Sequence, residues 1–190
     1  VLDSQSLSSY KREFKPQDLV VTVGSSKVTM ISTVVELHRT ELEASGMVRL
    51  FQVMDPGAFD RVFGPDIRDQ LELTDSNMSM DFLNLPEIGD YSVGFLMSVV
   101  TDDSIDTGHV VFFSSGHIFI KLIVLGLSDD LDVNDSALLA RIIENKIRLY
   151  PPDRAALTPE EIGDEVGQTI PEVPGLHTPE GVAYGRYNSV

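Results

Sequence analysis

The sequence predicts an α+β fold: an antiparallel β-sheet with helices packed on it, followed by an extended proline-rich tail. Strand-like runs rich in β-branched and aromatic residues come in pairs around short turns, which is typical of hairpins. Amphipathic helical segments separate these pairs. Six of the ten prolines fall after residue 150. We therefore expect a polar lead-in at 1–17, a single domain at 18–150 and an extended tail or linker at 151–190.

The first half of the domain contains one hairpin and two helix starts. The runs LVVTV and VTMISTVVEL flank the small-residue turn Gly24-Ser25-Ser26-Lys27, which predicts a hairpin. Thr40, with Glu43 three residues later, forms the capping-box signature of a helix start. Asp55-Pro56 predicts a second helix, which Gly64-Pro65 is expected to interrupt. The Ser-rich lead-in is expected to become ordered only if something holds it in place.

The second half contains four strand-like runs and the longest amphipathic helix. MSMDFLNL and YSVGFLMSVV predict two strands, and VVFFSSGHIFIKLIVLG (Val110 to Gly126) predicts a hairpin with a turn near Ser115-Gly116. A wide Leu/Ile stripe predicts a helix from Ser136 to Leu149, with Asn134 or Asp135 as its cap.

The second arm of this hairpin is apolar on both faces, apart from Lys121. One face carries Ile118, Ile120, Leu122 and Val124, and the other carries Phe119, Ile123 and Leu125 beside Lys121. Such a strand belongs in the middle of a covered sheet. A lone cation in an apolar arm needs solvent or a carboxylate. We therefore take Phe119, Lys121 and Ile123 as a candidate interaction face.

Composition excludes several classes of partner. The 190-residue chain has a formal net charge of −16, which repels nucleic acid and anionic membrane surfaces. It has no cysteine, and no apolar run approaches the roughly 20 residues that span a bilayer. Because the chain starts at Val1 without a signal segment, we expect that any signal or lipid anchor was removed or never included.

An acidic loop before the last helix suggests a calcium site. Asp130, Asp132 and Asn134 occupy the first, third and fifth positions of an EF-hand-like loop. The sixth position is Asp135 instead of glycine, and the twelfth is Arg141 instead of glutamate. An acidic helix N-terminus is therefore the favoured interpretation. A weak, non-standard calcium site stays open as the alternative.

Catalytic motifs are absent from the sequence. The four histidines, His38, His109, His117 and His177, are isolated, although His109 and His117 flank one hairpin and could approach each other across it. There is no nucleophile elbow and no phosphate-binding glycine loop. The sequence therefore predicts a protein that is not an enzyme and has no cofactor.

Three segments resemble a known layout. Gly89-Asp90-Tyr91-Ser92-Val93 is followed by Val110-Val111-Phe112-Phe113-Ser114-Ser115-Gly116 and then by Leu138-Leu139-Ala140-Arg141-Ile142-Ile143. Over about residues 85 to 150 this resembles small extracytoplasmic bacterial lipoproteins and sensor-like domains of the PsbP/Mog1-type α+β sandwich. The resemblance implies an antiparallel sheet with helices on it, and it brings no catalytic residues. The disulfides found in some of those proteins have no counterpart here.

Three functions follow from these observations, in order of preference. The first is a non-enzymatic extracytoplasmic binding or protein-interaction domain, periplasmic or at the cell surface, forming the soluble part of an anchored protein. Its partner would be another protein or a second copy of the chain. The second is a carrier of an apolar small molecule or lipid, in a sheet–helix cavity lined by some of the six Met and nine Phe residues. A metal-dependent hydrolase comes last.

Overall fold

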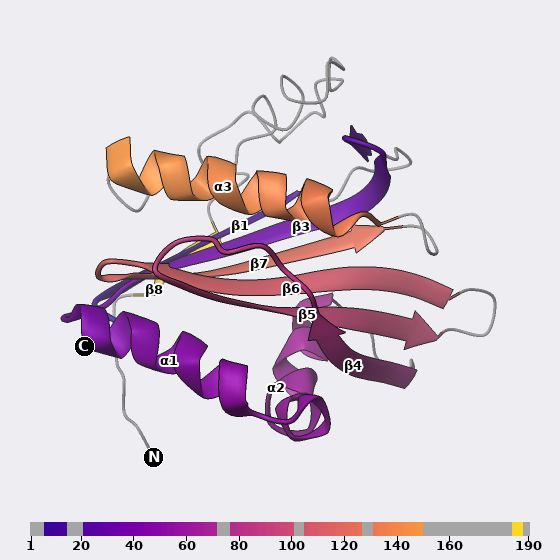
Figure 1. Ribbon diagram of the computed structural model, residues 1–190, viewed down its shortest axis with the longest axis horizontal. Coiled ribbons are helices and arrows are strands. Elements are labelled where there is room, and N and C mark those ends of the chain that lie inside the picture. Colours follow the sequence, from indigo (N-terminus) through magenta and orange to yellow (C-terminus); the bar gives the residue numbers. More distant parts are fainter. Residues whose placement is uncertain are drawn as a thin grey trace.

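The computed structural model describes residues 6–14, 21–71, 77–100, 105–126, 131–149 and 184–187. It confirms the expected α+β class (Figure 1). The helices are α1 (Glu41–Val53), α2 (Pro56–Leu71) and α3 (Val133–Leu149). The strands are β1 (Ser8–Phe14), β2 (Val21–Val23), β3 (Ser26–Leu37), β4 (Asn77–Leu83), β5 (Tyr91–Val100), β6 (Ile105–Ser115), β7 (Ile118–Gly126) and β8 (Tyr184–Tyr187).

All described strands belong to one antiparallel sheet. Seven of them follow the order β4-β5-β6-β7-β3-β1-β8, and β2 pairs with β3 beside this path. The predicted hairpins β2–β3 and β6–β7 are both present. The centre of the sheet is the pair β7–β3, which joins segments far apart in the sequence: Leu37 pairs with Ile118.

Helices cover both faces of the sheet, giving three layers. Figure 1 shows α3 above the sheet and α1 with α2 below it. The layer under α3 contains Val111, Phe113, Ile120, Leu122 and Val124 from the sheet, and Ala137, Leu139, Ala140 and Ile143 from the helix. The opposite layer contains Phe95, Val110, Phe112, Phe119 and Ile123 from the sheet, and Val48, Phe51, Phe59 and Ile67 from the helices. The expectation of a covered central hairpin is therefore confirmed.

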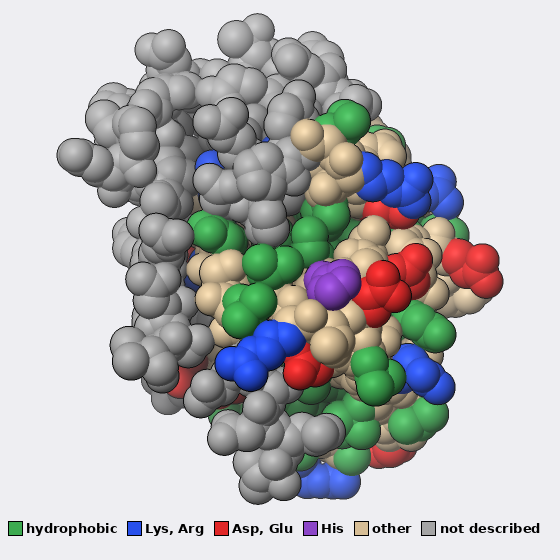
Figure 2. All heavy atoms as spheres, turned by 90° about the vertical axis from the view of Figure 1, so that its left-hand side faces the viewer, with side chains coloured by type: hydrophobic (Ala, Val, Ile, Leu, Met, Phe, Trp, Pro, Cys, Tyr) green, Lys and Arg blue, Asp and Glu red, His purple; other side chains and the backbone are tan. Residues whose placement is uncertain are grey.

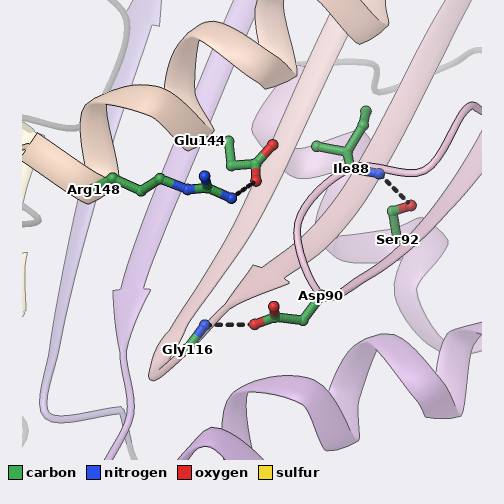
Figure 3. A network of polar contacts seen from close by, with 6 residues as sticks. All are labelled: Ile88, Asp90, Ser92, Gly116, Glu144 and Arg148. Atoms are coloured by element: carbon green, nitrogen blue, oxygen red, sulfur yellow. Dashed lines mark hydrogen bonds and ion pairs between the residues drawn. The ribbon is translucent and has the colours of Figure 1, made fainter.

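The turn between β6 and β7 is fastened to the loop before β5. Gly116 has a φ of 56°, which few other residues adopt readily, and its N–H donates to the Asp90 carboxylate at 2.7 Å (Figure 3). The Asp90 N–H donates in turn to the Ser114 carbonyl at 2.8 Å. A Cβ on Gly89 would collide with that same carbonyl, and Gly89 has a φ of 63°. The Gly-Asp pair therefore serves to hold this hairpin turn.

Helix α1 starts as predicted. Thr40 accepts a hydrogen bond from the Glu43 N–H at 3.2 Å, while the Glu43 carboxylate accepts from the Arg39 N–H at 3.0 Å. The predicted start at Asp55-Pro56 is also present, because Asp55 accepts from the Ala58 N–H at 3.1 Å.

The expected interruption at Gly64-Pro65 is wrong, because α2 runs continuously from Pro56 to Leu71. Proline removes one helical hydrogen bond, but packing on both sides compensates for that loss. Phe59 and Ile67 are both buried against the sheet, one on each side of the proline. Arg68 also forms an ion pair with Asp60 at 3.4 Å across this point.

Helix α3 starts three residues earlier than predicted, and a different residue caps it. Asp132 accepts from the Asn134 N–H at 2.8 Å, so the expected caps Asn134 and Asp135 are wrong. Asp135 instead receives hydrogen bonds from the backbone N–H groups of Ser25 and Ser26 at 2.9 and 3.0 Å, and from the Ser26 hydroxyl at 2.7 Å. This carboxylate ties the β2–β3 turn to α3.

Part of the predicted lead-in is a strand. Ser8–Phe14 pairs with β3 along its whole length and with β8 on its other side. The pairing with β3 provides the restraint that this polar segment was expected to need.

Candidate functional site

Lys121 lies in the middle of the sheet, on the face that α1 and α2 cover. In the strand register it stands between Phe112 of β6 and Val34 of β3. Phe119 and Ile123, two residues to either side on β7, point into the core formed with α1 and α2. The period of two in a strand places the Lys121 side chain on this same face. The predicted interaction face is thus turned toward helices.

A cavity of about 400 Å³ lies against this part of the sheet. Its sheet side consists of Val34 and Glu36 from β3, Phe112 from β6, and Phe119 and Lys121 from β7. Its helix side consists of Met47 and Phe51 from α1, and Phe63, Asp66, Ile67 and Asp69 from α2. Five segments that are separate in the sequence therefore meet around one space.

Aromatic rings form much of the cavity wall. The ring centroids of Phe51 and Phe112 are 4.7 Å apart, and those of Phe51 and Phe63 are 4.9 Å apart. Phe112 and Phe119 stack at 6.0 Å with an angle of 26° between their planes. Such rings offer a large apolar surface with well-defined geometry.

The remaining lining residues are charged. Burial lowers the pKa of Lys121 from 10.5 to about 8, and the charge of Lys11 lowers it too, while Glu36 and Asp66 act in the opposite direction. With Asp69, the lining holds three carboxylates and one amine. The cavity therefore combines an apolar wall with four ionisable side chains, two on the sheet (Glu36 and Lys121) and two on α2 (Asp66 and Asp69).

His38 adds a buried imidazole next to this wall. Its Nε2 lies 3.5 Å from the Glu36 carboxylate, and its ring stands edge-on to Phe119 with centroids 6.2 Å apart. His38 is 2 % exposed and does not itself line the cavity.

The calcium candidates do not come together as a described site. Asp130 lies outside the described residues. Asp132 accepts from both the backbone and the side-chain nitrogen of Asn134, at 2.8 and 3.0 Å, as a helix cap does. Within the described ranges, no group of three His, Cys, Asp or Glu side chains is placed to hold a metal ion.

The histidine pair across the β6–β7 hairpin is also absent. His109 lies near the middle of β6, where it pairs with Val124, whereas His117 sits in the turn. The His109 ring instead hydrogen-bonds Ser136 of α3 at 2.9 Å, and both side chains are buried. His177 lies outside the described residues.

Sequence reasoning singled out Phe119 and Lys121 as part of an interaction face, and both line the cavity, but it did not assign them to a cavity and it missed the helix side. Ile123, the third residue of the predicted face, is fully buried and does not line the cavity. Phe51 and Phe63 were recognisable as apolar helix positions, yet nothing in the local pattern shows which strand they face. Asp66 and Asp69 carry no sequence signal for this site.

Comparison with known proteins adds no further identification. No protein family, curated protein or solved structure matches this chain.

Proposed function

We propose that this protein is a non-enzymatic binding domain whose ligand is an apolar small molecule with one polar end. The observation that carries this proposal is the cavity of about 400 Å³ between the sheet and helices α1 and α2. Ligand sites in proteins commonly measure roughly 300–1,000 Å³ and combine apolar walls with a few polar groups. The carrier alternative from the sequence is thus the better supported of the two binding functions.

The lining indicates the chemistry of the ligand. Seven of its eleven residues are apolar, four of them phenylalanines, so most of the ligand surface should be hydrocarbon or aromatic. The polar end would face Lys121, with Glu36 or Asp66 beside it. A strongly anionic ligand is disfavoured, because three carboxylates surround one amine.

The proposal is tested with the apolar fluorophore N-phenyl-1-naphthylamine. We expect its fluorescence to rise saturably with the wild-type protein. Met47→Trp, which fills the cavity from α1, should weaken binding at least about tenfold, a loss of roughly 1.4 kcal/mol.

Leu50→Trp is the matched control for that experiment. Leu50 lies on the same helix, is 39 % exposed and does not line the cavity. Binding that is unchanged by Met47→Trp, or equally weakened by both variants, would overturn the proposal.

A protein partner or a second copy of the chain stays a prediction. One observation favours it: the edge strand β4 carries Phe82, which is 52 % exposed. On the face shown in Figure 2, acidic, basic and hydrophobic side chains are interspersed in the described part. Measuring the native mass of the purified chain tests for self-association.

The extracytoplasmic location, the lipid anchor and the PsbP/Mog1-type relationship also stay predictions. No helix in the described ranges has the length and apolar character needed to cross a membrane. A signal sequence ending in a lipidated cysteine, read from the full-length gene product, would support location and anchor together.

A further inference from the structure

Lys121 is placed to do more than contact the polar end of a ligand. Its side chain starts from a central strand and lines the cavity next to Phe112 and Phe119. An amine beside an apolar cavity is the arrangement in which lysines react with carbonyl compounds.

We propose that Lys121 captures aldehydes of apolar molecules reversibly, as an imine within the cavity. The inference rests on the proposed function, because the cavity must first hold the hydrocarbon part of the aldehyde. It narrows the ligand from any apolar molecule to one that carries a reactive carbonyl group.

The reaction balances without any further reagent. The neutral amine nitrogen of Lys121 attacks the carbonyl carbon, the π electrons of the carbonyl move to its oxygen, and one of the two amine protons passes from the nitrogen to that oxygen to give a carbinolamine. The nitrogen then loses its remaining proton, the hydroxyl group gains one and leaves as water, and a carbon–nitrogen double bond forms. Hydrolysis by the same steps in reverse releases the aldehyde.

Carboxylates in the same lining can carry these protons. Glu36 and Asp66 both line the cavity, and both interact electrostatically with Lys121. A carboxylate positioned in this way acts as a general acid and base when it lies within reach of the reacting atoms.

Lys121 is the one described lysine that lines the cavity, and burial also raises the share of its amine that is neutral and able to attack a carbonyl group. With a pKa of about 8, about one molecule in ten carries the neutral amine at pH 7, compared with about one in 3,000 for an ordinary lysine. The other described lysines, Lys11 on β1, Lys27 on β3 and Lys146 on α3, do not line the cavity. Selective labelling of one lysine is therefore expected.

The test uses the full chain and 2-naphthaldehyde as an apolar probe, with sodium cyanoborohydride to reduce the imine. Intact mass and peptide mapping should show one adduct, at Lys121, formed at least about ten times faster than at Lys27. The rate at Lys121 should rise with pH to a plateau, with its midpoint near 8. Lys121→Met should abolish this adduct, and Lys27→Met should not.

A second measurement needs no variant at all. N-phenyl-1-naphthylamine, which has no carbonyl group, should slow labelling of Lys121 in the wild-type protein by occupying the cavity. Labelling that is spread evenly over the lysines, or that is unaffected by this competitor, would overturn the proposal that Lys121 forms an imine within the cavity. If the fluorophore still binds and Met47→Trp weakens it, the proposed function survives that result; if the fluorophore does not bind, both proposals fail.

Discussion

Two basic side chains, the half-buried Lys121 and the buried His109, show how the position of a side chain changes its charge. Lys121 faces α1 and α2, and its pKa is lowered to about 8. His109 faces α3, where burial lowers its pKa to about 4 although Asp132 acts to raise it. Both shifts have the same main cause, because removing a cation from water disfavours its charged form. His109 is therefore neutral at pH 7 and available to hydrogen-bond Ser136.

His109 should make the protein less stable in mild acid. The unfolded chain takes up a proton below a pH of about 6.5, but the folded protein does so only near pH 4. The free energy of unfolding should therefore fall between pH 6.5 and pH 4, by roughly 1–3 kcal/mol from this residue. Urea unfolding at pH 7 and pH 4.5 measures the loss, and His109→Gln should show a smaller one.

His117→Gln is the control, because His117 is exposed in the β6–β7 turn. The loss of stability between pH 7 and pH 4.5 should be larger in that variant than in His109→Gln. An equal loss in the wild type and in His109→Gln would show that other groups carry the acid sensitivity.

At the level of elements, α2 shows tertiary packing prevailing over a local helix breaker. Pro65 lies inside a helix of 16 residues and is exposed to solvent. It contributes no core contact that would explain its presence, and it removes a backbone donor. Phe59, Phe63 and Ile67 keep both parts of the helix on the sheet and around the cavity.

Replacing this proline should stabilise the protein. Pro65→Ala restores a donor and a good helix former, so we expect the free energy of unfolding to rise by about 1–3 kcal/mol. Pro56→Ala is the matched control, because Pro56 occupies the first turn, where proline is favoured, and should bring no gain. Thermal and urea unfolding measure both variants. A destabilised Pro65→Ala would mean that the helix is adapted to the proline.

Local sequence patterns were sufficient to predict most helices and strands. They failed where contacts between residues far apart in the sequence determine the structure. Turn residues and β-branched runs predicted both hairpins, and Thr40 and Asp55 marked two helix starts, because these signals act within a few residues. Strand β1 was missed, since Lys11, Arg12 and Glu13 look like a solvated segment until β3 supplies a partner. The same limit applies to the cavity: the alternation around Lys121 was visible, but the helices that face it are placed by long-range packing.

At the scale of the whole molecule, charge opposes compaction. A net charge of −16 spread over 190 residues creates self-repulsion that the folded state feels more than the unfolded chain does. Raising NaCl from about 20 to about 200 mM shortens the screening length from roughly 20 Å to roughly 7 Å.

Salt should therefore stabilise the fold. We expect the melting temperature to rise by a few degrees over this range of NaCl, measured by circular dichroism at pH 7. Glycerol at the same osmolality is the control for effects unrelated to charge, and it should produce a smaller rise. A melting temperature that is unchanged or lowered by salt would indicate that specific ion pairs outweigh the general repulsion.

The pairing of β3 with β7 also determines when the sheet can be completed during synthesis on the ribosome. β3 emerges early, but its partner lies 81 residues later in the register, between Leu37 and Ile118. At a synthesis rate of roughly 5–20 residues per second, the edge of β3 that pairs with β7 stays unpaired for about 4–16 s. During that interval β1 and β2 can pair with β3 and leave only its other edge open. β1 and β2 can thus cover one edge of β3 early, whereas the edge that receives β7 stays unpaired until β7 has been made.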